Sequence, residues 1–102
     1  MRQLSANIVL VGFMGTGKSA VGRVIAQKLE FHFIDTDDVI EQTSKAKISD
    51  IFAEHGEVYF RDLESQAVKS VALMKNQVVA TGGGVVLRSS NIDLLRTGGP
   101  IF

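Results

Sequence analysis

The chain has 102 residues, 45% of them hydrophobic, which is enough for one small globular domain with a modest core. Its 11 basic and 11 acidic residues balance, so its overall charge favours neither nucleic acid nor an anionic membrane as a partner. It has no cysteine, which excludes disulfides and thiol chemistry, and its first apolar run is too short for a signal or membrane segment, so we expect a cytoplasmic protein.

The predicted elements alternate between strands and helices along the chain. An unbroken apolar run at 8–11 predicts a strand buried on both faces, and apolar residues at helical spacing over 18–29 predict an amphipathic helix. The later predicted elements are a strand at 31–34, short helices at 38–42 and 49–55, a long helix at 57–74, a strand at 78–80 and a helix at 91–96. Gly56 is predicted to end the second short helix. This alternation predicts an α/β fold with a parallel sheet sandwiched between helices.

The last three residues, Pro100-Ile101-Phe102, look like the beginning of a fourth strand beside the first. A buried strand rarely starts at a natural C-terminus, because its continuation fills the sheet. The sequence contains no repeat, low-complexity tract or linker. We therefore interpret 1–102 as the N-terminal part of a single domain, cut short at the start of its fourth strand.

A phosphate-binding loop follows the first predicted strand. The segment GFMGTGKS at 12–19 matches G-x-x-x-x-G-K-[ST] at every fixed position. Its glycines allow backbone N–H groups to wrap a phosphate, and the next helix presents its positive dipole end to the same anion. Lys18 can reach the β- and γ-phosphates, and the Ser19 hydroxyl can ligate Mg²⁺. A chance glycine-rich turn is the alternative, but the position between a buried strand and an amphipathic helix favours a nucleoside triphosphate site.

Polar residues and glycines also follow the second and third predicted strands, where open parallel sheets bind their ligands. The sequence after the second strand is Asp35-Thr36-Asp37-Asp38. We interpret Asp38 mainly as a helix N-cap, whereas Asp35 and Asp37 are spaced so that one could face a metal ion and the other a hydroxyl. Three consecutive glycines at 82–84 follow the third strand, which indicates that the backbone comes very close to a ligand.

Arg61 and Glu64 lie three residues apart in the predicted long helix. Their spacing alone favours an exposed ion pair worth a few tenths of a kcal/mol. On residue spacing, a functional role for Arg61 is therefore the less favoured interpretation.

The motifs taken together resemble the shikimate kinase family, in order and spacing, over the whole chain. They are the loop at 12–19, Asp35-Thr36-Asp37, Phe60-Arg61 with Glu64, and the glycines at 82–84. The resemblance reverses the interpretation of Arg61. It implies a P-loop kinase fold and a transfer of phosphate from ATP to the 3-hydroxyl of shikimate, with Mg²⁺ as cofactor, in aromatic amino-acid biosynthesis. It also implies a monomer with no nucleic-acid or membrane partner.

The resemblance implies a role for each motif residue in binding nucleotide and metal. Lys18 is one of two catalytic residues, and Ser19 holds Mg²⁺ directly while Asp35 lies near the metal, through water. The residues implied to hold the ATP phosphates are Gly15, Thr16, Gly17, Lys18, Ser19 and Ala20.

The resemblance also implies the acceptor site. Asp37, the second catalytic residue, orients the shikimate hydroxyl and could act as its base. Arg61 grips the shikimate carboxylate as a bidentate fork, and Gly83 offers its backbone N–H to the substrate. Glu64 braces Arg61. The remaining supporting residues are Phe60, Gly82 and Gly84.

Two other interpretations stay open. Another small-molecule P-loop kinase, of the gluconate or nucleoside monophosphate type, shares the phosphate loop. A non-catalytic domain of shikimate kinase type usually lacks the lysine or the substrate aspartate, whereas Lys18 and Asp37 are both present. The family's lid arginines and adenine-packing loop have no counterpart in 1–102, so we expect this chain alone to be poorly active.

Overall fold

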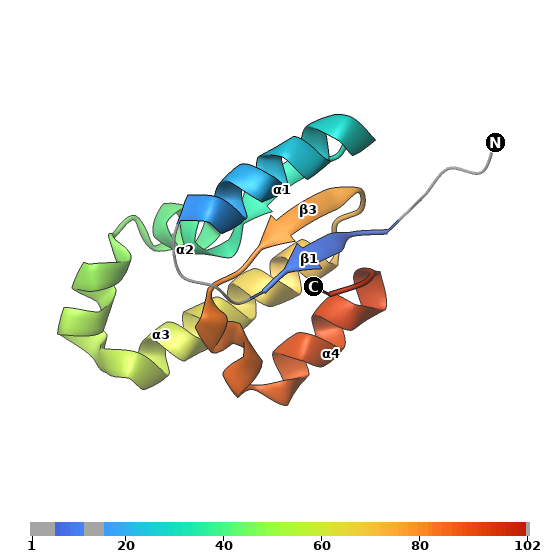
Figure 1. Cartoon of the computed structure of the whole chain (residues 1–102). Helices are drawn as coiled ribbons and strands as arrows, with labels where there is room; N and C mark the ends of the chain where they lie inside the picture. Colours follow the sequence, from blue (N-terminus) through green and yellow to red (C-terminus); the bar gives the residue numbers. More distant parts are fainter. Residues whose placement is uncertain (1–5, 12–15, 102) are drawn as a thin grey trace.

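The computed structural model describes residues 6–11 and 16–101. Its helices and strands alternate as the sequence predicts, and Figure 1 shows their arrangement. In chain order the elements are β1 (Ile8–Leu10), α1 (Thr16–Leu29), β2 (His32–Asp35), α2 (Thr36–Ser44), α3 (Ile48–Ala72), β3 (Gln77–Ala80), the 3₁₀ turn η1 (Gly83–Leu87) and α4 (Ser89–Gly98).

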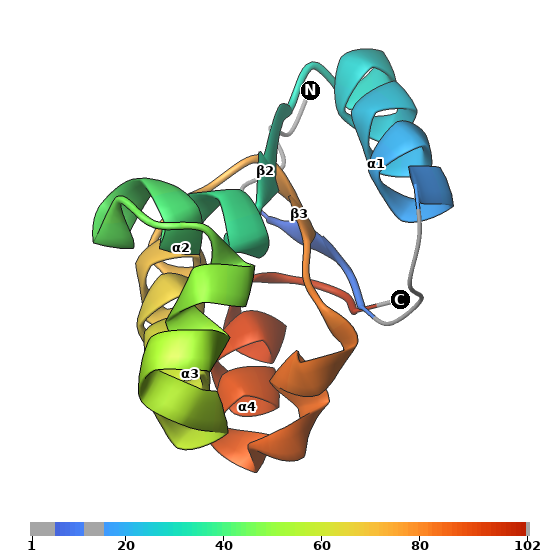
Figure 2. The same ribbon diagram turned by 90° about the vertical axis from the view of Figure 1, so that its left-hand side faces the viewer.

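The three strands form a parallel sheet in the order β1-β3-β2. Helix α1 connects β1 to β2 by crossing over β3 and covers one face of the sheet, while α2, α3 and α4 lie on the other face (Figures 1 and 2). The predicted α/β fold is therefore confirmed. Ile101 forms a parallel bridge with Val9, as expected for a segment pairing beside the first strand, while Phe102 lies outside the described residues.

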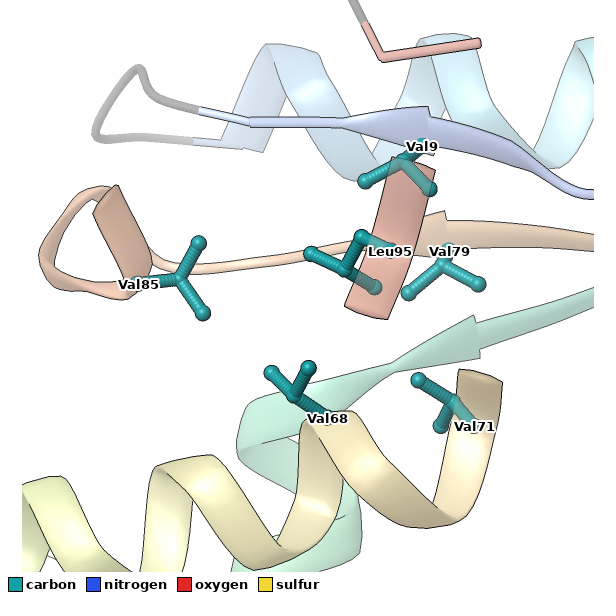
Figure 3. Close-up of a cluster of buried hydrophobic side chains, with 6 residues drawn as sticks. All are labelled: Val9, Val68, Val71, Val79, Val85 and Leu95. Atoms are coloured by element: carbon teal, nitrogen blue, oxygen red, sulfur yellow. The ribbon is translucent and has the colours of Figure 1, made fainter. Parts of the chain in front are cut away.

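The main core lies between the sheet and helices α3 and α4. It contains two strand residues, Val9 and Val79, together with side chains from α3, η1 and α4, all of them buried (Figure 3). The contributors from outside the sheet are Val68, Val71, Val85 and Leu95. The apolar run of β3 is buried because helices cover it, whereas in β1 only Val9 is buried and Ile8 and Leu10 are half-buried, so the prediction that this strand is buried on both faces is met only in part.

Helix α1 faces the sheet with a different side from the one its apolar pattern suggests. Gly22 and Ala26 are buried, whereas Val21 and Val24 are exposed. A Cβ at Gly22 would touch Phe33 of β2 and Leu10 of β1, so the helix lies very close to the sheet at its small residues. The predicted helix is confirmed, but small residues, Gly22 and Ala26, form its packed face, and Val21 and Val24 do not.

The segment between β2 and β3 differs from prediction at its boundaries. Helix α2 begins at Thr36 rather than at 38, and its N-cap is Asp35, so the interpretation of Asp38 as the cap is wrong. The two predicted helices at 49–55 and 57–74 are the two parts of α3, which Gly56 interrupts with φ 83° and ψ −179°. Side chains of α2 and α3 form a second buried cluster of Ile40, Ile51, Phe60 and Ala67.

Candidate active site

The carboxyl ends of the three strands lie side by side. Leu10 of β1 and Asp35 of β2 both pair with Ala80 of β3, and the Thr81 N–H donates to the Leu10 carbonyl at 3.0 Å. Whatever follows these strands therefore meets at one edge of the sheet. The segments that follow are the loop leading to α1, the beginning of α2, and the glycines before η1.

The phosphate loop is described only in part. Gly15, with the rest of 12–15, lies outside the described residues, and of Thr16, Gly17, Lys18 and Ser19 only the backbone is described. The backbone of Thr16 begins α1, and Ala20 is exposed in the same part of the helix. The N-terminus of α1 thus follows β1 closely, which is the arrangement that anion binding by backbone N–H groups requires.

Asp35 caps helix α2 at the end of β2. Its Oδ1 accepts a hydrogen bond from the Asp37 N–H at 2.9 Å, and its extended backbone (φ −114°, ψ 126°) is the usual conformation of an N-cap. The bond fixes the Asp35 carboxylate at the strand end through one of its two oxygens. Among the described residues, no group of three or more His, Cys, Asp or Glu side chains is placed to hold a metal ion.

Arg61 lies between two glutamates of α3. Its Nη1 donates to Glu64 Oε1 at 3.2 Å and its Nη2 to Glu57 Oε2 at 3.3 Å. The side chains of Arg61 and Glu64 are 19% and 2% exposed, so the prediction of an exposed pair is wrong. The guanidinium also lies 5.3 Å from the centre of the Phe60 ring, and Phe60 is itself buried against Phe52. An arginine held so firmly is preorganised to bind an anion.

The glycines after β3 bring this arginine and the aspartate of α2 together. A Cβ at Gly82 would lie 3.7 Å from Asp37 Oδ1 and 3.8 Å from Glu64 Oε2, so both carboxylates contact the same stretch of backbone. A Cβ at Gly84 would overlap the Arg61 guanidinium. Gly83, between them, is the first residue of η1. At Gly84 the backbone thus approaches Arg61 very closely, while the predicted approach of the tract to a ligand stays a prediction.

The carboxylate of Glu64 is unusual in its electrostatics. Burial raises the pKa of Glu64, and the neighbouring Asp37 charge raises it further, whereas the hydrogen bond and charge of Arg61 and the charge of Arg88 lower it only in part. The net raised pKa shows that the protein holds this carboxyl in a place that disfavours its charge. Such a group is more often found at a functional site than on a plain surface.

Two charged residues near Arg61 and Glu64 were not identified from the sequence: Glu57 and Arg88. Glu57 lies four residues before Arg61, a spacing that could have revealed it as a helical partner. Arg88, which precedes α4, contacts Asp62 Oδ1 at 2.9 Å and Ser65 Oγ at 3.2 Å on α3. No local sequence pattern identifies Arg88 as part of the site, because its partners lie more than twenty residues earlier in the chain.

A family model described as shikimate kinase matches residues 14–102. The shikimate kinase of Thermodesulfovibrio yellowstonii is 53% identical over 96 residues, and that of Caldanaerobacter subterraneus subsp. tengcongensis is 55% identical over 96 residues. Both alignments cover 94% of this chain but only 56% of the relative. The chain thus spans little more than half the length of these relatives.

Solved structures agree with the sequence comparison. The structure named shikimate kinase from Acinetobacter baumannii in complex with shikimate has a TM-score of 0.90 at 40% identity, covering 95% of this chain and 54% of that one. Shikimate kinase from Bacteroides thetaiotaomicron gives 0.89 at 36% identity, covering 96% and 56%. Within the described part of the chain, no helix is both long and apolar enough to cross a bilayer.

Proposed function

This chain belongs to the shikimate kinase family, and we propose that it carries the phosphate-binding and acceptor-binding parts of an enzyme that phosphorylates shikimate with ATP. One observation supports the acceptor site above all. Arg61 is held in a nearly buried ion pair and lies with Asp37 against a single glycine tract at the carboxyl edge of the sheet. A fixed guanidinium beside a carboxylate is what an acceptor with a carboxylate and a hydroxyl needs.

The nucleotide side of the proposed site is the loop between β1 and α1. The phosphates of ATP are held by the backbone of Gly15 to Ala20 and by the charge of Lys18. Ser19 and Asp35 are the residues we assign to Mg²⁺, which when bound neutralises charge on the β- and γ-phosphates. The donor set fits, because Asp35 uses only its Oδ1 for the cap of α2 and Mg²⁺ commonly takes one or two carboxylates with water.

The acceptor side of the proposed site is built from α2, α3 and the glycine tract. Arg61 binds the carboxylate of shikimate, Glu64 braces Arg61, and the Gly83 N–H contacts the substrate. Asp37 orients the 3-hydroxyl and receives its proton while the hydroxyl oxygen bonds to the γ-phosphorus and the bond to ADP breaks. Holding the two reactants in line supplies most of the catalysis in such a reaction.

We further propose that residues 1–102 are one part of a single kinase domain, and that the protein is a cytoplasmic monomer. Lid and adenine-binding segments of this family have no counterpart in 1–102, and closure of a lid excludes water from such sites. The short chain alone is therefore expected to transfer phosphate poorly.

The test compares several phosphate acceptors. The full-length gene product is incubated with ATP and Mg²⁺ and with shikimate, gluconate or a nucleoside monophosphate, and ADP release is followed. Shikimate should be the strongly preferred acceptor. Preference for gluconate or a nucleotide would identify a different P-loop kinase, and ATP binding without transfer to any acceptor would indicate a non-catalytic domain.

A further inference from the structure

We propose that Glu57 pairs with the Arg61 guanidinium in the free protein, and that the carboxylate of the acceptor displaces Glu57 when it binds. Glu57 would then be a specificity-determining residue that acts through Arg61. This inference rests on the proposed function, because it assumes that Arg61 binds the acceptor's carboxylate.

The two glutamates that hold Arg61 differ greatly in their surroundings. Glu64, which bonds Nη1, has a side chain only 2% exposed, whereas the side chain of Glu57, which bonds Nη2 at 3.3 Å, is 63% exposed. An exposed ion pair contributes little free energy because water solvates the separated charges almost as well. Glu57 can therefore leave Arg61 at small cost, but Glu64 cannot, since its carboxylate would remain buried without its partner.

The hydrogen bonding of Arg61 is incomplete in a way that fits this exchange. Its Nε is buried and has no hydrogen-bond partner among the described residues. A guanidinium binds a carboxylate best through two neighbouring N–H groups. With Nη1 committed to Glu64, the remaining neighbouring pair is Nε and Nη2, and Glu57 occupies the second of these.

The surroundings of Arg61 leave an incoming carboxylate little choice but the position that Glu57 occupies on Nη2. The backbone of Gly84 packs directly on the guanidinium, and the side chain of Arg61 is only 19% exposed. A carboxylate that binds Nε and Nη2 side by side must displace Glu57 from Nη2. The Gly56 break, whose position has open space around it, directly precedes Glu57, so that residue lies at the start of a helical segment.

The local charge gives the exchange its selectivity. Arg61 already faces Glu57 and Glu64, and Asp37 lies against the same glycine tract as Glu64. A further carboxylate added to this cluster is repelled, whereas one that replaces Glu57 leaves the charge around Arg61 unchanged. An acceptor without a carboxylate cannot make this replacement and leaves Arg61 paired with Glu57.

The test compares Glu57→Gln with the wild type in the full-length gene product. Removing the competing charge should lower the KM for shikimate by about two- to fivefold, the range for losing an exposed ion pair, with little change in the KM for ATP. Glu54→Gln is the matched control, because Glu54 is an exposed glutamate of the same helix that pairs with His55 and not with Arg61. That control should leave both KM values unchanged.

A second measurement uses shikimate methyl ester, which has no negative charge at the carboxyl carbon. Its KM should be the same in the wild type and in Glu57→Gln, since a neutral ester does not compete with Glu57. An unchanged or raised KM for shikimate in Glu57→Gln would overturn the proposal and make Glu57 a bystander or a brace. An equal gain for shikimate and its ester would overturn it too. A wild-type protein inactive toward shikimate would refute the proposed function itself, before Glu57 is tested.

Discussion

The buried carboxylate of Glu64 holds Arg61 in a fixed position, and its burial lowers the stability of the folded protein. Its carboxyl is buried, and it holds Arg61 while burial and the nearby Asp37 raise its pKa. A glutamine at 64 would fit the same space without a charge. The cost of keeping the glutamate should therefore be visible in the stability of the protein.

This cost has a definite pH dependence. Because the pKa of Glu64 in the folded protein is raised above its ordinary value of 4.5, the folded state binds the proton more tightly than the unfolded state. The resulting stabilisation is complete below that ordinary value and is lost as pH rises through the folded pKa. Urea unfolding between about pH 4 and about pH 8 should show wild-type stability falling relative to Glu64→Gln. Parallel pH profiles for the two proteins would contradict the raised pKa.

Gly84 and Gly82 provide a matched pair of substitutions in the glycine tract. Gly84→Ala places a methyl group where the Arg61 guanidinium lies, so the arginine must move. Gly82→Ala makes only ordinary contacts, at 3.7 Å from Asp37 and 3.8 Å from Glu64. We expect Gly84→Ala to raise the KM for shikimate by about tenfold or more, as for loss of one charge-assisted hydrogen bond. Steady-state kinetics should show a much smaller rise for Gly82→Ala; equal rises would contradict this account.

At the scale of single elements, helix α3 depends on the backbone of Gly56. With φ 83° and ψ −179°, this residue has a conformation that other amino acids rarely adopt, and no atom lies within 4 Å of a Cβ built there. Gly56→Ala should therefore cost about 1–3 kcal/mol through backbone strain alone. Thermal or urea unfolding tests this, with Glu54→Ala in the same helix expected to be near neutral. A neutral Gly56→Ala would mean that the break is not required.

The elements also show what the sequence can and cannot predict. In the described part of the chain, apolar runs and glycines located the strands and α-helices to within a few residues, although α3 was predicted as two helices and η1 was not predicted. Hydrophobic periodicity and the backbone freedom of glycine are properties of the local sequence. Which face of α1 packs on the sheet was not predictable, since Gly22 and Ala26 allow a closer approach than Val21 and Val24. The role of Asp35 as the cap of α2 also differed from prediction, because neighbouring aspartates are chemically equal candidates.

The site could be predicted in part for similar reasons. The phosphate loop has a contiguous signature, and Asp37 and the glycines follow strands whose ends meet in any parallel sheet. The spacing of Arg61 and Glu64 did not predict that the pair is buried, because its burial depends on how the segment at η1 packs over α3. Arg88 was missed because its contacts to Asp62 and Ser65 are long-range.

At the scale of the whole molecule, Asn7 connects several elements at the amino ends of the strands. It is 3% exposed; its Nδ2 donates to the Met74 carbonyl at 2.9 Å and its Oδ1 accepts from the Gln77 N–H at 2.9 Å. Its own N–H donates to the Gly98 carbonyl at 2.7 Å. The side chain thus joins the beginning of β1 to the end of α3 and the beginning of β3, and the backbone N–H joins it to the end of α4.

Removing this connection should destabilise the molecule. Asn7→Ala leaves two backbone groups without partners and should lower the unfolding free energy by about 1–3 kcal/mol. Asn7→Asp keeps the acceptor for Gln77 but places a buried carboxylate oxygen against the Met74 carbonyl, so its loss should be at least as large as that of the alanine variant. Urea unfolding of the three proteins checks the order, and an alanine variant as stable as the wild type would contradict it.

At this scale we propose that one edge of the sheet carries two separate sites, a nucleotide site at the β1–α1 loop and a carboxylate site at Arg61. The most direct test is Arg61→Lys, which keeps the charge but loses the bidentate geometry. The KM values for shikimate and ATP are measured in the full-length gene product. We expect the KM for shikimate to rise by about tenfold or more while the KM for ATP stays almost unchanged. Equal changes in both KM values, or none, would contradict it.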